Sequence, residues 1–275
     1  IIFGKKGFVA KHFIDLLNKK KIINKPISSK KINLLHQSSI KKIQKLIKEK
    51  DIIVFISALA PVKNLEMYNK NLKMLTNFMM GIQNKTISHL IYISSDAVYS
   101  DSYAKINEKS DTDPGSLHGI MHLTREKLLQ TVNTDLTIVR PTLIYGNDDP
   151  HNGYGPNKFT RLVKRNLDIV LFGKGEERRD HIWVNDLAKL IVIIVQRKIT
   201  GIINATTGKV ITFNKIARII KKISNKKIDI IYTKRSGKMP HNGYRAFQKS
   251  RIQKLIPGFK FNEISTTLKN IYKHY

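Results

Sequence analysis

The chain has 275 residues, of which 41% are hydrophobic and 25% charged, a composition typical of globular proteins with a sizeable core. It contains no cysteine, which excludes disulfides, thiolate metal sites and cysteine nucleophiles. Its longest purely apolar run, residues 190–195, is far shorter than the roughly 20 residues that span a bilayer. We therefore expect a cytoplasmic protein without a membrane span.

Short apolar runs alternate with amphipathic segments along the first half of the chain. The apolar runs predict strands at residues 1–3, 21–27, 51–56, 89–94 and 136–140. The amphipathic segments predict helices at residues 7–18, 40–48, 65–81 and 117–132. This alternation is typical of an α/β fold, and right-handed connections favour a Rossmann-like, doubly wound parallel sheet. Because the first residue already lies in an expected strand, we expect natural residues to precede it.

The character of the sequence changes in the second half, where turn formers crowd residues 147–155 and the expected elements become shorter. We predict an NAD(P)-binding domain over residues 1–146, which also receives residues 182–205. A smaller substrate-binding lobe is predicted over residues 147–275. No internal repeat or low-complexity linker separates them, so we expect the two parts to pack closely.

The formal net charge of +30 has two explanations. A phosphate-rich partner, such as nucleic acid or a nucleotide substrate, would be attracted by it. Lysine, isoleucine and asparagine recur in nearly every segment, however, so a general compositional bias is the simpler explanation. Neither a basic tail nor a basic stripe with interleaved aromatic residues is present, so nucleic acid is not the expected partner.

A glycine motif lies between the first expected strand and helix. Gly4, Gly7 and Ala10 have the spacing G-x-x-G-x-x-A. The first glycine permits a tight turn, the second lets the backbone approach a pyrophosphate, and the small third residue lets helix pack on strand. We therefore expect these residues, with Phe8 and Val9, to bind a dinucleotide.

This segment resembles the G-x-x-G-F-x-G fingerprint of extended short-chain dehydrogenases, the NAD-dependent epimerase/dehydratase family. Three further segments resemble motifs of that family in the same order, namely residues 92–99, 140–146 and 173–186. The resemblance covers essentially the whole chain. It implies an oxidoreductase-type enzyme, either a nucleotide-sugar epimerase or a ketosugar reductase, whose product serves polysaccharide biosynthesis. Because relatives often form homodimers, the resemblance also makes a homodimer possible.

The end of the second expected strand bears on the choice of cofactor. A carboxylate there would bind the ribose hydroxyls of NAD, whereas basic residues accommodate the 2′-phosphate of NADP. Here Ser29 and Lys30 stand in that segment without a carboxylate, which favours NADP over NAD. Family position further implies that Ala58, Asn71 and Thr142 line the cofactor site.

The catalytic residues depart from the family pattern. The resemblance implies Ser95 as the hydroxyl that binds the reacting oxygen, but His118 and His122 replace the Tyr-x-x-x-Lys pair. Since histidine has an ordinary pKa near 6.5, we expect His118 to exchange protons without a neighbouring lysine and His122 to bind the ribose. The alternatives are a degenerate site that binds dinucleotide together with RNA or a protein partner, and a metal-binding histidine pair. No third metal ligand stands out in the sequence.

The remaining site residues follow from the resemblance. Asp96 follows Ser95 without the second carboxylate of sugar-nucleotide dehydratases, so epimerisation or reduction is favoured over dehydration. Arg179 and Arg235 align with arginines that hold the substrate diphosphate, for which a planar guanidinium is suited. Asn157 and Arg245 are further candidates for binding the substrate.

Overall fold

The computed structural model describes residues 1–274, and its contacts divide the chain into two compact units. Unit 1 comprises residues 1–100, 108–141 and 187–204, and unit 2 comprises the rest of the described chain. The chain passes into unit 2 after Pro141, whereas the sequence analysis drew the boundary after residue 146. Within residues 1–274, no helix has the length and apolar character that crossing a membrane requires.

Unit 1 is built on a six-stranded sheet with the strand order β2-β1-β3-β4-β5-β9. The strands are β1 (Ile2–Phe3), β2 (Pro26–Ile27), β3 (Ile52–Phe55), β4 (His89–Ile93), β5 (Leu136–Pro141) and β9 (Gly201–Ala205). Strands β2, β1, β3, β4 and β5 are parallel, so their carboxyl ends meet at one edge. The strand order reverses beside β1, the position where ligands bind in open α/β sheets. The predicted doubly wound sheet is confirmed.

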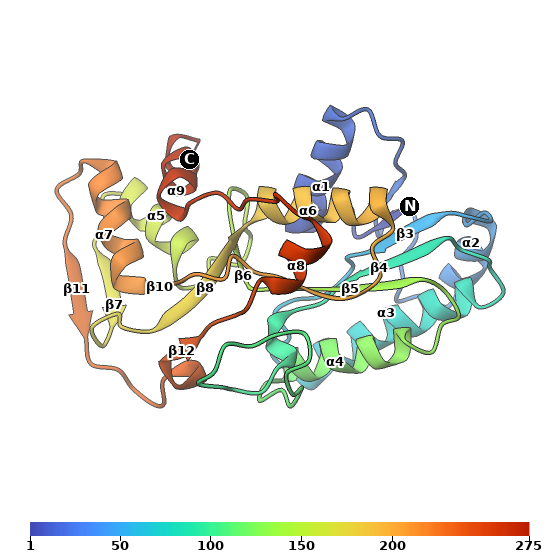
Figure 1. Ribbon diagram of the computed structural model, residues 1–275, viewed down its shortest axis with the longest axis horizontal. Coiled ribbons are helices and arrows are strands. Elements are labelled where there is room, and N and C mark those ends of the chain that lie inside the picture. The colour runs from blue at the N-terminus through green and yellow to red at the C-terminus, as the bar shows by residue number, and fades with distance from the viewer. Residues whose placement is uncertain (275) are drawn as a thin grey trace. The chain divides into compact units, whose positions relative to one another are not determined.

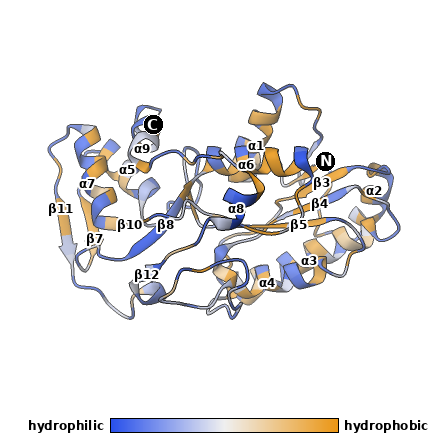
Figure 2. Cartoon of the chain, in the orientation of Figure 1, coloured by the Kyte–Doolittle hydropathy of each residue, from blue (hydrophilic) through white to orange (hydrophobic). Residues whose placement is uncertain are grey.

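Helices cover both faces of this sheet, with α3 and α4 on one side of the strands and α1 and α6 on the other (Figure 1). The helices are α1 (Phe8–Lys19), α2 (Ser39–Leu46), α3 (Leu65–Ile82), α4 (Leu117–Leu129) and α6 (Val184–Arg197), with a short 3-10 turn η1 (Asp96–Val98) after β4. Figure 2 shows the strands β3, β4 and β5 as predominantly hydrophobic. Strands that are apolar on both faces require helices on both sides, which explains this layering.

The second strand is shorter than the sequence analysis predicted. Residues 21–25 are not in a strand, and β2 contains only Pro26 and Ile27. Lys21 adopts a left-handed φ of 55° and its amide bonds back to Asn18 at the end of α1, which turns the chain away from the sheet. Ile23 is consequently fully exposed, so the apolar pattern of this segment was misleading.

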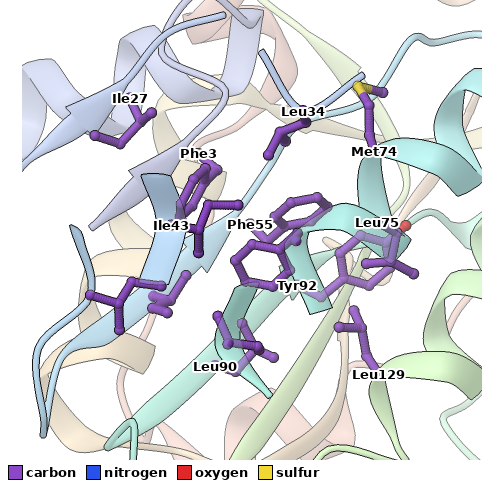
Figure 3. Close-up of a cluster of buried hydrophobic side chains, with 14 of the residues drawn as sticks. Phe3, Ile27, Leu34, Ile43, Phe55, Met74, Leu75, Leu90, Tyr92 and Leu129 are labelled. Atoms are coloured by element: carbon purple, nitrogen blue, oxygen red, sulfur yellow. The ribbon is translucent and has the colours of Figure 1, made fainter. Parts of the chain in front are cut away.

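Aromatic side chains form the centre of the unit 1 core. Phe55 of β3 lies 4.5 Å from Phe78 of α3 and 6.3 Å from Tyr92 of β4, measured between ring centroids. Figure 3 shows Tyr92 among Phe55, Leu75 and Leu90. A tyrosine buried at this depth needs a polar partner for its hydroxyl, and that partner lies on α4.

Unit 2 contains shorter strands and its own apolar core. Its elements are β6 (Leu143–Tyr145), α5 (Pro156–Lys164), β7 (Ile169–Phe172), β8 (Arg178–Trp183), β10 (Val210–Thr212), α7 (Phe213–Ser224), β11 (Ile230–Thr233), η2 (Pro240–Gly243), β12 (Tyr244–Arg245), α8 (Ser250–Leu255) and α9 (Ile264–Lys273). Strand β8 lies between β10 and β12 and also pairs with β6, so it is the central strand of this unit. Figure 2 shows β8 as predominantly hydrophilic.

The packing of α2 on α3 requires a glycine at position 81. A Cβ atom at Gly81 would lie 2.7 Å from both Cβ and Cγ2 of the buried Ile43. Because these atoms lie next to the backbone of α2, we expect Gly81→Ala to lower the free energy of unfolding by about 1–3 kcal/mol. Urea denaturation checks this, with Gly115→Ala as the control because nothing lies within 4 Å of its Cβ position. Equal stability of the two variants would contradict this packing.

Candidate active site

The glycine turn after β1 lies close to the backbone that follows β3. Gly4 adopts a φ of +110°, and a Cβ atom there would lie 2.9 Å from the backbone nitrogen of Ser57. Gly7 caps α1 without a side-chain hydrogen bond, and the first turn holds no acidic residue. The first amide groups of α1 are therefore suited to an anionic group such as a pyrophosphate. Phe8, Val9 and Ala10 form this first turn, with Val9 and Ala10 buried against the sheet.

The residues expected to select the cofactor lie beside this turn. Ser29 and Lys30 are exposed in the turn that follows β2. The Lys5 amide donates to the Ile27 carbonyl, so the glycine turn is joined to the end of β2. No Asp or Glu occurs from residue 28 to residue 48, so the segment that follows β2 offers no carboxylate to a ribose hydroxyl.

The loop after β3 is held by two buried side chains. The Asn71 amide accepts from the Leu59 amide and donates to the carbonyls of Leu59 and Met67. The guanidinium of Arg125 donates to the carbonyls of Ser57, at 2.8 Å, and Asn71, at 2.5 Å. Asn71 thus supports the loop that carries Ala58, because both of its amide hydrogens are used within the protein.

The turn η1, which Ser95 caps, packs against α4, whose first turn contains His118. Ser95 caps η1, and its hydroxyl accepts from the Ala97 amide at 3.1 Å. Asp96, the next residue, is buried. A Cβ atom at Gly119 would lie 2.1 Å from the Ala97 carbonyl oxygen, so glycine is required after His118 for this contact.

His118 lies in the first turn of α4, which Ser116 caps by accepting from the Gly119 amide. Its Nδ1 atom lies 3.4 Å from the backbone nitrogen of Val62, in the loop after β3. Because an amide can only donate, Nδ1 of a neutral His118 carries the lone pair and Nε2 carries the proton. The half-buried ring therefore connects α4 to that loop.

His122 points into the protein. Its Nδ1 atom lies 2.7 Å from the Tyr92 hydroxyl, and both side chains are buried. Burial lowers the pKa of His122 well below its ordinary value, and the charges of His118 and Arg125 act in the same direction. His122 is therefore neutral near pH 7 and does not supply the positive charge that a lysine would supply.

A buried ion pair lies next to Ser94, the residue before Ser95. It was not among the candidates from the sequence. Glu126 of α4 accepts two hydrogen bonds from Arg140 of β5, at 3.0 and 2.5 Å, and one from the Ser94 hydroxyl at 2.5 Å. The sequence signal was available, because Glu126 stands eight residues after His118 and so lies near the same helix face. The pair joins α4 to β4 and β5.

The other predicted residues lie in unit 2. The Thr142 hydroxyl donates to the buried Asp180 at 3.1 Å. Arg179, in β8, lies 3.2 Å from Glu177, and Asn157 connects the Gly146 amide to Asp149. Arg235 follows β11 and donates weakly to the Phe172 carbonyl at 3.4 Å. The site residues are thus divided, with Ser95, His118 and His122 in unit 1 and these four in unit 2.

A second arginine lies beside Arg179 in unit 2. Arg245 of β12 is paired in register with Arg179 of β8, and its guanidinium lies 3.1 Å from both Asp101 and His241. Arg245 is a substrate-binding candidate from the sequence, but the strand pairing that brings it beside Arg179 is not visible in the sequence. Among residues 1–274, no group of three or more His, Asp or Glu side chains is arranged to hold a metal ion.

The family model of the NAD dependent epimerase/dehydratase family matches residues 1–205, so the chain belongs to this family. An uncharacterized UDP-glucose epimerase, YtcB, from Bacillus subtilis (strain 168) is 23% identical over 190 residues, which cover 66% of this chain and 59% of the relative. The match thus spans less than two thirds of the relative's length.

Solved structures of low sequence identity share the fold. The UDP-N-acetylglucosamine 4-epimerase from Methanobrevibacter ruminantium M1, in complex with UDP-N-acetylmuramic acid, has a TM-score of 0.83 and 22% identity over 99% of this chain and 96% of its own. RMD from Pseudomonas aeruginosa, complexed with NADPH, has a TM-score of 0.83 and 18% identity over 99% and 97% of the two chains. Both matches extend over unit 1 and unit 2.

We expect the buried His181 to make the stability of the protein depend on pH. His181 is enclosed by Tyr145 and Phe213, and burial lowers its pKa to about 3. An unfolded histidine titrates near 6.5, so between pH 6.5 and 3 the unfolded state binds more protons and the folded state loses stability as the pH falls.

We expect His181→Phe to remove about 1.4 kcal/mol per pH unit from this dependence, measured by urea unfolding between pH 8 and 4. His151→Phe is the control, because His151 is exposed in the same unit. An unchanged pH dependence in His181→Phe would show that His181 is not held neutral.

Proposed function

We propose that the protein is an NAD(P)-dependent nucleotide-sugar epimerase or ketosugar reductase in which Ser95 and His118 assist hydride transfer at a sugar carbon. The observation that carries this proposal is the junction of η1 with α4, where Gly119 lets the helix approach the Ala97 carbonyl. This junction supports the proposal because Ser95 caps η1, directly after β4, and His118 stands in the first turn of α4.

The chemistry that the bound dinucleotide supplies is the giving or taking of a hydride at its nicotinamide ring. The protein's own residues hold the sugar oxygen and move its proton. Ser95 orients that oxygen by hydrogen bonding, and His118 exchanges the proton, since an imidazole with an ordinary pKa near 6.5 gains and loses a proton near neutral pH. No carboxylate pair follows Ser95, because Ala97 comes after Asp96, which disfavours elimination of water.

The proposed substrate is a sugar joined to a nucleoside diphosphate. Arg179 and Arg235 are the proposed diphosphate ligands, with Asn157 and Asp96 as further contacts, because guanidinium groups bind phosphate through paired hydrogen bonds. The family includes enzymes that act on such substrates, as the names of the relatives indicate. We place the protein in the cytoplasm and in polysaccharide biosynthesis, and a homodimer is the expected assembly.

Replacing His118 tests its role. We expect His118→Phe to lower turnover of a nucleotide-ketosugar by about 10²- to 10⁴-fold, because the proton at the sugar oxygen loses its carrier. Stopped-flow oxidation of NADPH gives the rate, and fluorescence titration shows that NADPH still binds. His36→Phe makes the same change at an exposed histidine of unit 1. A His118→Phe variant as active as His36→Phe would mean that His118 carries no proton.

The cofactor proposal favours NADP over NAD, because Lys30 stands in a turn without carboxylates. We expect NADPH to bind more tightly than NADH, and Lys30→Glu to weaken NADPH binding by about tenfold, the effect of roughly 1.4 kcal/mol. Lys85→Glu makes the same charge change at the amino-terminal edge of β4 and serves as the control. Binding of NAD at least ten times tighter than binding of NADP would reject the preference.

Failure of both dinucleotides to bind would favour the second candidate, a degenerate protein of this fold that binds RNA or a protein partner. The observation behind this candidate is the loss of the tyrosine and the lysine together with a net charge of +30. Micromolar RNA binding that vanishes near physiological salt would be nonspecific attraction rather than function.

A further inference from the structure

A chain of buried side chains leads from the core of the sheet to the proposed catalytic histidine. Tyr92 projects from β4, and its hydroxyl lies 2.7 Å from Nδ1 of His122 on α4. His122 in turn lies against His118, with ring centroids 4.7 Å apart and ring planes at 89°. Tyr92, His122 and His118 therefore form a continuous series of contacts.

The Tyr92 end of this series is rigid. The ring of Tyr92 packs against Phe55 in the centre of the unit 1 core and is almost completely buried. Interiors of proteins are close-packed, so a buried ring in such a position has little freedom to move. The hydrogen bond transmits this rigidity to the imidazole of His122.

The protonation states of Tyr92 and His122 favour a role in orienting His118 over a role in changing its charge. Arg125 lies one turn beyond His122 and acts on the pKa of both Tyr92 and His122, while Glu126 is neutralised by Arg140. Burial raises the pKa of Tyr92 and lowers that of His122, so both remain neutral over the physiological range. Neither group carries a charge that would alter His118.

We propose that Tyr92 is a positioning residue: its hydroxyl holds the His122 ring, which supports the ring of His118 at the start of α4. The catalytic consequence rests on the function proposed above, whereas the positioning itself does not. His122 stands at the helix position where the family resemblance implies a lysine, and the neutral Tyr92–His122 pair orients the proton carrier His118.

The test is Tyr92→Phe, which retains the packed ring and removes only the hydroxyl. Tyr99→Phe is the matched control, because Tyr99 is equally buried in unit 1 and its hydroxyl donates to Asn204 at 2.7 Å. Two readouts are compared, namely the ring nitrogen and proton resonances of His118 and His122 by NMR, and the rate of NADPH oxidation. His122→Phe is the second variant, because it keeps a ring beside His118 but cannot bond to Tyr92.

We expect Tyr92→Phe and His122→Phe to shift the His118 resonances and to lower turnover about 10- to 100-fold, with NADPH affinity unchanged in Tyr92→Phe. The double variant should lose no more than either single variant, because both act on one contact. Shifted resonances in a protein whose wild type has no turnover would support the positioning and refute the proposed function. Unchanged His118 resonances in both variants, or equal effects in Tyr99→Phe, would overturn the positioning role.

Discussion

The ion pair between Glu126 and Arg140 fixes the position of helix α4, and the proposed site depends on where that helix lies. Both side chains are buried, so separating them would leave an uncompensated charge in the core, at a cost of about 3–5 kcal/mol. Glu126 also accepts a hydrogen bond from the Ser94 hydroxyl. This bond connects α4 to the end of β4, directly before Ser95. The hydroxyl and the imidazole are positioned by one shared anchor.

The proposed site differs from the family pattern in the groups that surround the proposed proton carrier. The resemblance implies a lysine cation that lowers the pKa of a tyrosine one helical turn away. In this chain His122 occupies the lysine position, is neutral, and bonds inward to Tyr92. Histidine needs no such cation to exchange protons near pH 7, so the two replacements are chemically consistent with each other. Orientation by packed neutral groups takes the place of electrostatic activation.

Much of unit 1 was predictable because its elements have strong local signals. The glycine spacing, the apolar strands and the helix starting near His118 all follow from residue patterns, and the structure confirms the doubly wound sheet. The second strand was overestimated because Lys21, at the start of the apolar run, adopts a left-handed conformation that turns the chain away from the sheet, and periodicity does not reveal this. The Tyr92–His122 bond and the Arg179–Arg245 pairing join residues distant in sequence, so only the fold brings them together.

The proposed function requires that this His-substituted site still transfers hydride to or from a nucleotide sugar. The most direct measurement is incubation of the wild-type protein with NADPH deuterated at the transferable position and a panel of nucleoside-diphosphate ketosugars, followed by mass spectrometry of the sugars. We expect deuterium bound to carbon in the reduced product of one substrate class. Tight NADPH binding without label in any sugar, and without epimerisation of the corresponding nucleotide sugars in the presence of NAD, would contradict it.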